Sequence, residues 1–257
     1  LPISFPFDQR LLAQEIAASK AHARALKIGG VLSDTELSNI LGGLERILAE
    51  GIPAQDDPEV EDVHHFVEKR LIALIGETGR KLHTGRSRNE QIATGLRLYI
   101  RDAIDENVQL LGRFISALIE QAEKAGTAAM PSYTHLQRAE PVLVAHWLLA
   151  YVEMAFRDID RLTDCRARVN QCPLGSGAIA GTILPLDREA IACELGFDAP
   201  TRNSLDATSD RDFCIEFVQS VATLGMHLSR WAEEMALFST REYGFVILPE
   251  QYATGSS

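Results

Sequence analysis

The sequence predicts an all-α protein in which a small N-terminal helical domain precedes an elongated bundle of long helices. Three long segments repeat apolar residues at spacings that alternate between three and four, a period typical of helices. Glycine pairs and a helix-start signal divide the first third of the chain into shorter pieces, and no segment is rich in strand-forming residues. We place the domain boundary near residue 85, which gives domains 1–85 and 86–257.

The N-terminal region carries its own helix signals. The run Ser33-Asp-Thr-Glu36 predicts a capping box that opens a short helix. Gly29-Gly30 precedes this run and marks a break in the chain. Pro53 and Pro58 predict a loop over residues 52–59. Short helices joined by loops are therefore expected before the bundle.

The bundle is predicted from the three apolar repeats. In chain order they are Ile104, Val108, Leu111, Ile115, Leu118, Ala122; Val142, Ala145, Leu149, Val152, Phe156, Ile159; and Phe217, Val221, Leu224, Leu228, Trp231, Met235, Phe238. Repeats sustained over this length indicate helices that pack along a shared seam. Pro141 suits the first turn of the second helix, where its missing N–H costs no hydrogen bond. Because long helices in a small bundle leave apolar surface open, we predict an oligomer.

The charge balance argues against nucleic acid and membranes as partners. The 25 basic and 36 acidic residues give a formal net charge of −11, a sign that repels polyanions. Val142–Val152, the most apolar stretch, contains His146 and is too short to span a bilayer. A small anionic substrate is still compatible with this charge, because clustered arginines can outweigh it inside a cleft.

The cysteines and the N-terminus predict a cytoplasmic protein. No Cys-x-x-Cys pair occurs, and no cysteine stands at zinc-ligand spacing from a histidine. We therefore expect no metal and four buried, reduced thiols, as in a reducing compartment. The four cysteines are Cys165, Cys172, Cys193 and Cys214. The first residues also lack the basic and apolar pattern of a secretory leader.

The strongest functional candidate is the polar segment 81–94, which leads into the first long helix. Arg86 and Arg88 are planar donors suited to carboxylates, and Asn89 can both donate and accept. Gly85 allows close backbone approach, and the following helix N-terminus favours an anion. A basic loop that balances acidic surface is the alternative. The variety of polar residue types in one stretch favours a function.

Three other polar segments are ambiguous when each is taken alone. His64 and Glu68 share a helix face, so they indicate either a solvated ion pair or the wall of a cleft. His135, in the polar segment 130–141, is either structural or able to move a proton near neutral pH. The final segment 254–257 is typical of a flexible Gly-Ser tail.

Taken together, these segments resemble the sequence blocks of argininosuccinate lyases. The matching runs are Ser4 with Phe7-Asp8 and Arg10-Leu11, Glu61-Asp-Val-His64 with Val67-Glu68, Lys81-Leu-His-Thr-Gly-Arg-Ser-Arg-Asn89, Tyr133-Thr-His-Leu-Gln-Arg138, Pro173-Leu-Gly-Ser-Gly-Ala-Ile-Ala-Gly-Thr182, and Arg202-Asn-Ser-Leu-Asp206 with Ser209-Asp-Arg-Asp212. The related fumarases, aspartases and adenylosuccinate lyases carry other residues in place of the 85–89 run. Gly255-Ser-Ser257 is similar to the opening of the superfamily's signature loop. One departure is Glu90, where the family usually has Asp.

The resemblance implies a fumarase/aspartase-like fold and a cofactor-free anti β-elimination that splits argininosuccinate into arginine and fumarate. Catalytic roles are implied for His135 and Ser256. Contacts to the substrate are implied for Ser4, Arg88, Asn89 and Thr134. Supporting or uncertain positions are His64, Arg86, Ser87, Gln137 and Ser257.

The resemblance also implies a homotetramer whose subunits share active sites and which needs neither a metal nor an organic cofactor. Because the chain ends inside the signature loop, with the C-terminal domain absent, we expect this chain alone to be inactive. Two alternatives stay open. One is another fumarate-releasing lyase of the superfamily, and the other is a non-catalytic protein related to lens δ-crystallins.

Overall fold

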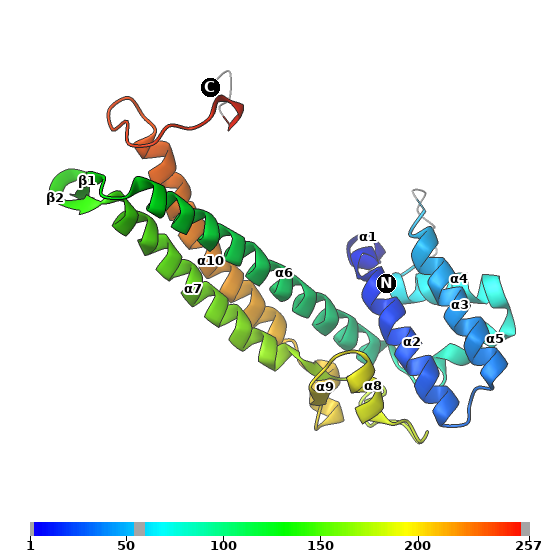
Figure 1. Ribbon diagram of the computed structural model, residues 1–257. Coiled ribbons are helices and arrows are strands. Elements are labelled where there is room, and N and C mark those ends of the chain that lie inside the picture. Colours follow the sequence, from blue (N-terminus) through cyan, green and yellow to red (C-terminus); the bar gives the residue numbers. More distant parts are fainter. Residues whose placement is uncertain (1–2, 54–59, 253–257) are drawn as a thin grey trace. The chain divides into compact units, whose positions relative to one another are not determined.

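The computed structural model describes residues 3–53 and 60–252, and helices dominate them (Figure 1). The chain divides into two compact units. The first unit combines Leu1–Ala103 with Arg166–Ile215, and the second combines Ile104–Cys165 with Glu216–Ser257. The all-α class is confirmed, whereas the domain boundary near residue 85 stays a prediction. Most of the predicted loop 52–59 lies outside the described residues.

The elements follow one another in the order labelled in Figure 1. The α-helices are α1 (Phe5–Asp8), α2 (Leu12–Ile28), α3 (Asp34–Glu50), α4 (Val63–Ile75), α5 (Glu77–Arg80), α6 (Arg88–Ala125), α7 (Val144–Val169), α8 (Arg188–Glu194), α9 (Ser204–Ser209) and α10 (Asp212–Phe238). The 3-10 helices are η1 (Gln9–Leu11), η2 (Lys81–His83) and η3 (Glu250–Tyr252). The strands are β1 (Ala129–Thr134) and β2 (Gln137–Leu143), which are antiparallel, and β3 (Gln171–Cys172) and β4 (Ala199–Pro200), which are parallel.

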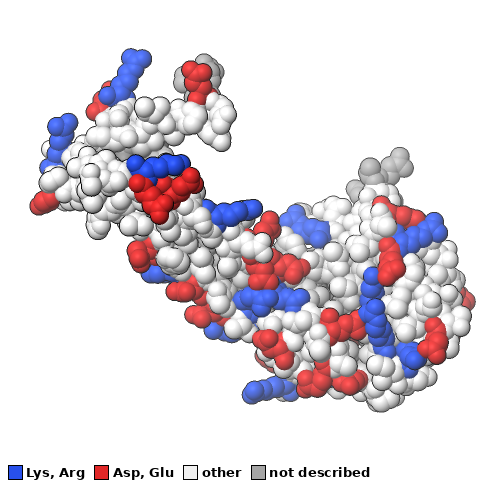
Figure 2. Space-filling view, viewed as in Figure 1, with Lys and Arg blue, Asp and Glu red and all other residues white. Residues whose placement is uncertain are grey.

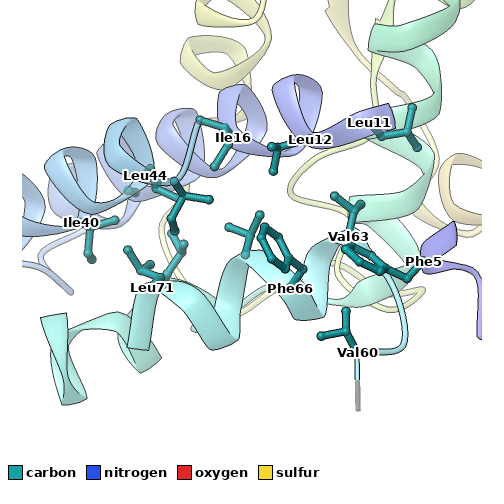
Figure 3. Packing of buried hydrophobic residues seen from close by; sticks show 14 of the residues in the cluster. Phe5, Leu11, Leu12, Ile16, Ile40, Leu44, Val60, Val63, Phe66 and Leu71 are labelled. Carbon is teal, nitrogen blue, oxygen red and sulfur yellow. The ribbon is translucent and has the colours of Figure 1, made fainter. Parts of the chain in front are cut away.

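Helices α2, α3 and α4 enclose an apolar core in the first unit. Figure 3 shows Leu12, Leu44 and Phe66 directed from these helices into one shared space, and all three are buried. The rings of Phe5 and Phe66 stack there with their centroids 5.5 Å apart. Removing these apolar faces from water is the main force that holds the short helices together.

Side-chain caps fix where α3 and α4 begin. The Ser33 hydroxyl accepts from the N–H of Glu36, and the Glu36 carboxylate accepts from the N–H of Ser33. The predicted capping box is therefore confirmed, although α3 runs for 17 residues and is not a short helix. Asp62 Oδ1 accepts from the N–H of His65 at 2.7 Å and caps α4 in the same way.

Arg97 fastens the first part of α6 to the ends of α7 and α9. Its Nη1 donates to the carbonyls of Arg168 and Val169, each at 3.0 Å. Its Nη2 lies 2.5 Å from Asp210 Oδ2, and its guanidinium stacks 4.2 Å from the centre of the Phe213 ring. These contacts satisfy carbonyls at the end of α7 and hold the following segment beside α6.

The second unit contains the bundled parts of α6, α7 and α10, as the apolar repeats predicted. Phe114, Tyr151 and Trp231 each come from a different helix and meet edge to face. The buried carboxylate of Asp158 lies among them, 2.7 Å from His227 Nδ1. Helices α6, α7 and α10 therefore share one core that contains the carboxylate–imidazole pair of Asp158 and His227.

The predicted seam of α7 is partly wrong. Leu149 and Phe156 are 41% and 48% exposed, whereas Leu148 and Ala155, one position earlier, are buried. Leu228 in α10 is likewise 43% exposed. A long amphipathic helix has apolar residues on two adjacent faces, and contacts with neighbouring helices decide which face is buried.

Residues 129–143 form a hairpin where a loop and a helix start were predicted. The two strands pair with a bulge between Pro131 and Tyr133. Pro141 pairs with Pro131 in β2, and α7 begins only at Val144, so the predicted place of Pro141 in a first helical turn is wrong. A two-stranded ribbon tolerates proline because each strand is an edge strand.

The surface of the described residues is mixed in charge. Basic and acidic side chains are interspersed on the face drawn in Figure 2. Cys165 and Cys172 are buried as expected, but Cys214 is only partly buried and Cys193 is exposed. The reason is that the short helix α8 buries Ile191 and Ala192 and turns the next residue outward. None of the helices within the described ranges combines the length and the apolar character that a membrane span needs.

Candidate functional site

An open cleft of about 540 Å³ lies in the first unit, between the loop before α6 and the glycine-rich run after β3. Its lining residues are His83, Gly85, Arg86, Ser87, Arg88, Gly177, Ala178, Gly181 and Thr182. The predicted arginine segment therefore forms one wall, and the run 173–182 forms the other. Two guanidinium groups beside the N-terminus of a 38-residue helix make the cleft suitable for an anion.

Arg86 places a buried positive charge at this cleft. Its side chain is only 4% exposed, and its Nη1 donates to Ser19 Oγ at 2.9 Å and lies 3.8 Å from Glu15 Oε1. Burial lowers the pKa of Arg86, while the charges of Glu15 and Glu90 oppose that shift. Among the described residues its Nε has no hydrogen-bond partner. Arg86 therefore brings a buried positive charge to the wall of the cleft.

Glu15 is the centre of a buried network that sequence reasoning missed. Its Oε2 lies 2.6 Å from His64 Nδ1, and its Oε1 accepts from Ser19 Oγ at 2.7 Å and from Gln91 Nε2 at 3.1 Å. Burial raises the pKa of Glu15, but the charge and hydrogen bond of His64 and the charge of Arg86 lower it overall, to about 2. The carboxylate is therefore ionised at neutral pH and orients the arginine.

His64 does not pair with Glu68, so the prediction of a solvated ion pair between them is wrong. His64 is 3% exposed and faces Glu15, whereas Glu68 Oε2 lies 3.9 Å from Arg88 Nη2. A signal for this network existed in the sequence. Glu15 and Ser19 lie four apart among the apolar positions of a helical segment, and buried polar residues in such a place need partners.

Arg88 and Ser4 come from other parts of the chain, and both contact the residues that precede α4. The Nε of Arg88 is 3.3 Å from Asp62 Oδ2, the carboxylate that also caps this helix. The N–H of Ser4 donates to the Glu61 carbonyl at 2.9 Å, and the Ser4 hydroxyl donates to Asp8 Oδ2 at 2.6 Å. Ser4 is exposed. Arg88 is therefore already held by protein carboxylates on one side.

Ser87 and Asn89 flank the first residue of α6 and lie near the glycine-rich run. Ser87 Oγ accepts from the N–H of Asn89 at 3.3 Å. Asn89 Nδ2 donates to the Ala178 carbonyl at 3.1 Å, which ties the helix start to the opposite wall of the cleft. The exposed amide of Asn89 therefore stands at the edge of the cleft, as expected for a residue that contacts a ligand.

The second unit presents Thr134, His135 and Gln137 at the tip of the β1–β2 hairpin, all exposed. Thr134 and Gln137 pair, so His135 and Leu136 form a two-residue turn with φ values of 52° and 59°. Such a turn usually takes Asn-Gly, because positive φ is unfavourable for larger side chains. Strain of this kind is concentrated at functional sites, which favours a function for His135.

Aromatic side chains pack around Tyr133, which lies in the strand that leads into this turn. Tyr133 packs against Phe238, Tyr243 and Phe245, with centroids 5.2–6.2 Å apart. The segment after α10 is therefore anchored beside the strand that carries Thr134. Ser256 and Ser257 lie outside the described residues.

Apart from Ser4, which lies beside Glu61 and Asp8, and Ser256 and Ser257, the predicted residues fall into two sets. In the first unit, the cleft brings together Arg86, Ser87, Arg88 and Asn89, with His64 in the network that orients Arg86. In the second unit, the hairpin brings together Thr134, His135 and Gln137. Within residues 3–53 and 60–252, no three His, Cys, Asp or Glu side chains are grouped to hold a metal ion.

His22 makes the folding stability of the first unit depend on pH in the acid range. It is fully buried on α2, and its Nε2 lies 3.0 Å from the Thr84 carbonyl. Burial and the charge of Arg86 lower the pKa of His22 to about 3. The folded state thus keeps it neutral while the unfolded chain takes up a proton below about pH 6.5, so stability is lost as pH falls from there toward 3.

We predict that His22→Gln weakens the pH dependence of unfolding. Between pH 7 and pH 5, protonation of His22 in the unfolded chain is expected to lower the free energy of unfolding of the wild type by about 2 kcal/mol. The variant lacks this group and should not show that loss. Urea denaturation of the full-length protein at both pH values measures this, with the exposed His146→Gln as control. Equal pH dependence in His22→Gln and the wild type would contradict the prediction.

Comparisons with known proteins give a consistent result. A family model described as "Lyase" matches residues 3–257. An argininosuccinate lyase of Koribacter versatilis is 68% identical over 99% of this chain and 55% of its own length, and one of Halorhodospira halophila is 54% identical over 99% and 55%. The crystal structure of EDDS lyase in complex with formate matches with a TM-score of 0.87 and 31% identity, over 97% of this chain and 50% of that one. The chain spans about half the length of the curated relatives it matches.

Proposed function

Because the chain belongs to the lyase family whose model matches residues 3–257, we propose that the full-length protein is an argininosuccinate lyase. It would form arginine and fumarate in arginine biosynthesis. The relative at 68% identity carries that name over nearly this whole chain. The observation that carries the proposal is the cleft at the start of α6, where Arg86 and Asn89 stand beside a helix N-terminus. That arrangement suits a substrate that bears carboxylates.

The chemistry is an elimination that breaks a carbon–nitrogen bond. A base removes the proton from the carbon next to a carboxylate, and that carboxylate takes up the charge until the guanidino nitrogen of arginine leaves. Stabilising extra charge on a group that is already anionic requires positioned donors. In our proposal Asn89, Thr134 and Ser4 contact the substrate, and Arg88 completes the positive wall.

His135 and Ser256 carry the proton transfers in this proposal. Ser256 is assigned as the base, although a serine needs a neighbouring cation or amides to stabilise its alkoxide. His135 is assigned to acid–base work or to polarising the leaving group. Its exposed position in a strained turn supports a role at a surface that meets another group.

We also propose a cytoplasmic homotetramer whose subunits complete each other's sites. Exposed apolar side chains on the long helices support an assembly, because contact with another subunit would remove this apolar surface from water. Among them are Leu110, Leu149, Phe156, Val218 and Leu228, which are 41–63% exposed. Sharing sites between subunits would explain why the residues implied by the resemblance lie in separate units of one chain.

Fumarate release tests the proposed activity. Purified full-length protein is expected to release fumarate from argininosuccinate, with kcat/KM at least roughly 10³-fold higher than for adenylosuccinate or aspartate. Preference for another substrate would favour a different lyase of the superfamily. No release from any of the three, with the protein folded, would favour a non-catalytic δ-crystallin-like role.

A further inference from the structure

Glu90 is completely buried and does not line the cleft, yet it joins the two walls of the cleft. We propose that Glu90 is a positioning residue that fixes the width of the cleft by holding the glycine-rich run 173–182 against the start of α6. The inference rests on the proposed function for its kinetic consequence, because it treats the cleft as part of the substrate site.

The two carboxylate oxygens of Glu90 serve different walls. Oε1 accepts from the N–H of Ser87 at 3.1 Å, which closes the first turn of α6. Oε2 accepts from the N–H of Gly175 at 2.6 Å and from that of Gly177 at 2.9 Å. Three main-chain donors on one buried carboxylate are charge-assisted bonds, which are stronger than bonds between neutral groups.

The glycine-rich run has little room to adopt another shape. Gly175 and Gly177 have φ values of 95° and 61°, in the left-handed region that favours glycine. A Cβ on Gly177 would lie 2.3 Å from the Gly181 carbonyl oxygen. The Gly181 N–H also donates to the Ser176 carbonyl at 2.7 Å. The run is therefore a compact turn in which the N–H groups of Gly175, Ser176, Gly177 and Gly181 all have acceptors.

Arg188 also holds the same run. Its Nη2 donates to the Thr201 carbonyl and hydroxyl, each at 3.0 Å, and reaches Ser176 Oγ at 3.5 Å. A Cβ on Gly175 would lie 2.8 Å from the Cγ of Arg188. Arg188 ties the run to Thr201, whereas Glu90, together with the Asn89–Ala178 hydrogen bond, ties it to the start of α6.

The run reaches the cleft through Gly177, Ala178, Gly181 and Thr182, which all line it. The Ala178 carbonyl accepts from Asn89 Nδ2, so displacing the run also releases the amide proposed to contact the substrate. The effect of Glu90 on a substrate therefore passes through the position of the run. Binding should suffer more than the chemical step, because Glu90 contacts no reacting atom.

Glu90→Gln tests this inference. Its amide NH₂ must face at least one of the three N–H donors, so the clamp opens at Oε1 or at Oε2. We expect KM for argininosuccinate to rise roughly 10- to 100-fold with kcat changed less than about threefold. Hydrogen exchange of the peptide that contains Gly175 and Gly177 is expected to become at least roughly tenfold faster.

Glu36→Gln is the matched control. Glu36 is the capping-box glutamate of α3, where a Gln carbonyl can still accept from the Ser33 N–H. The same change therefore removes a carboxylate charge and its ion pair with Lys81 without touching the glycine-rich run. Its KM and the exchange of the run should match the wild type. If Glu90→Gln fails to fold, Glu90→Asp keeps the charge but is one methylene shorter, and it should raise KM and exchange in the same direction by a smaller factor.

The outcomes separate the two proposals. A folded Glu90 variant with wild-type KM and wild-type exchange of the run overturns the role of Glu90. Faster exchange without any change in KM would mean that the run is structural only, and this also overturns it. If the wild type releases no fumarate, the proposed activity fails, while the exchange comparison still decides whether Glu90 clamps the run.

Discussion

Glu15→Gln is expected to lower the free energy of unfolding by about 3–5 kcal/mol. The substitution keeps the shape of the side chain but removes the negative charge that lies 3.8 Å from Arg86 and the carboxylate oxygen that lies 2.6 Å from His64 Nδ1, both inside the protein. A buried charge that loses its partner retains the full cost of desolvation. Urea denaturation of the full-length protein at fixed concentration measures the loss.

An exposed ion pair provides the control for this measurement. Glu45 pairs with Lys20 at 3.4 Å, but its side chain is 68% exposed, so Glu45→Gln should cost less than about 1 kcal/mol. A double-mutant cycle with His64→Gln should show coupling of at least about 1 kcal/mol. Additive effects, or a Glu15→Gln protein as stable as the Glu45→Gln protein, would show that the network does not carry the stability assigned to it.

His135→Asn is expected to lower kcat for argininosuccinate by about 10²- to 10⁴-fold while leaving the fold intact. The side chain is exposed at the hairpin turn, so its loss removes proton transfer and no core packing. Asparagine also tolerates the positive φ of 52° at this position, which keeps the turn. Steady-state kinetics together with far-ultraviolet circular dichroism measure both parts. A decrease of less than tenfold would remove His135 from the proposed mechanism.

Mixing subunits extends the same prediction to the assembly. Full-length His135→Asn and Ser256→Ala proteins, each inactive alone, should regain measurable activity after they are unfolded and refolded together. Recovery requires some sites to receive an intact His135 from one subunit and an intact Ser256 from another. If labelled subunits exchange freely and no activity returns, each site is built from a single chain and the proposal of shared sites is wrong.

Local patterns in the sequence determined the long helices and the composition of the cleft's arginine wall. The apolar repeats predicted α6, α7 and α10, because a period between three and four residues suits no other regular structure. Ser33 and Glu36 predicted their capping box for the same reason, since both partners lie within one turn. The arginine segment 81–94 was singled out by residue type alone. The relatives that match this chain confirm the resemblance to argininosuccinate lyases.

Tertiary structure alone decided the partners of the buried polar groups. Glu15 meets His64 and Gln91 from 49 and 76 residues away, and Glu90 meets Gly175 from 85 residues away. It also decided that α7 buries Leu148. In each case the outcome depends on which surfaces meet after the chain closes large loops. Periodicity describes one segment at a time, and a buried hydrogen bond is defined only when both segments are in place.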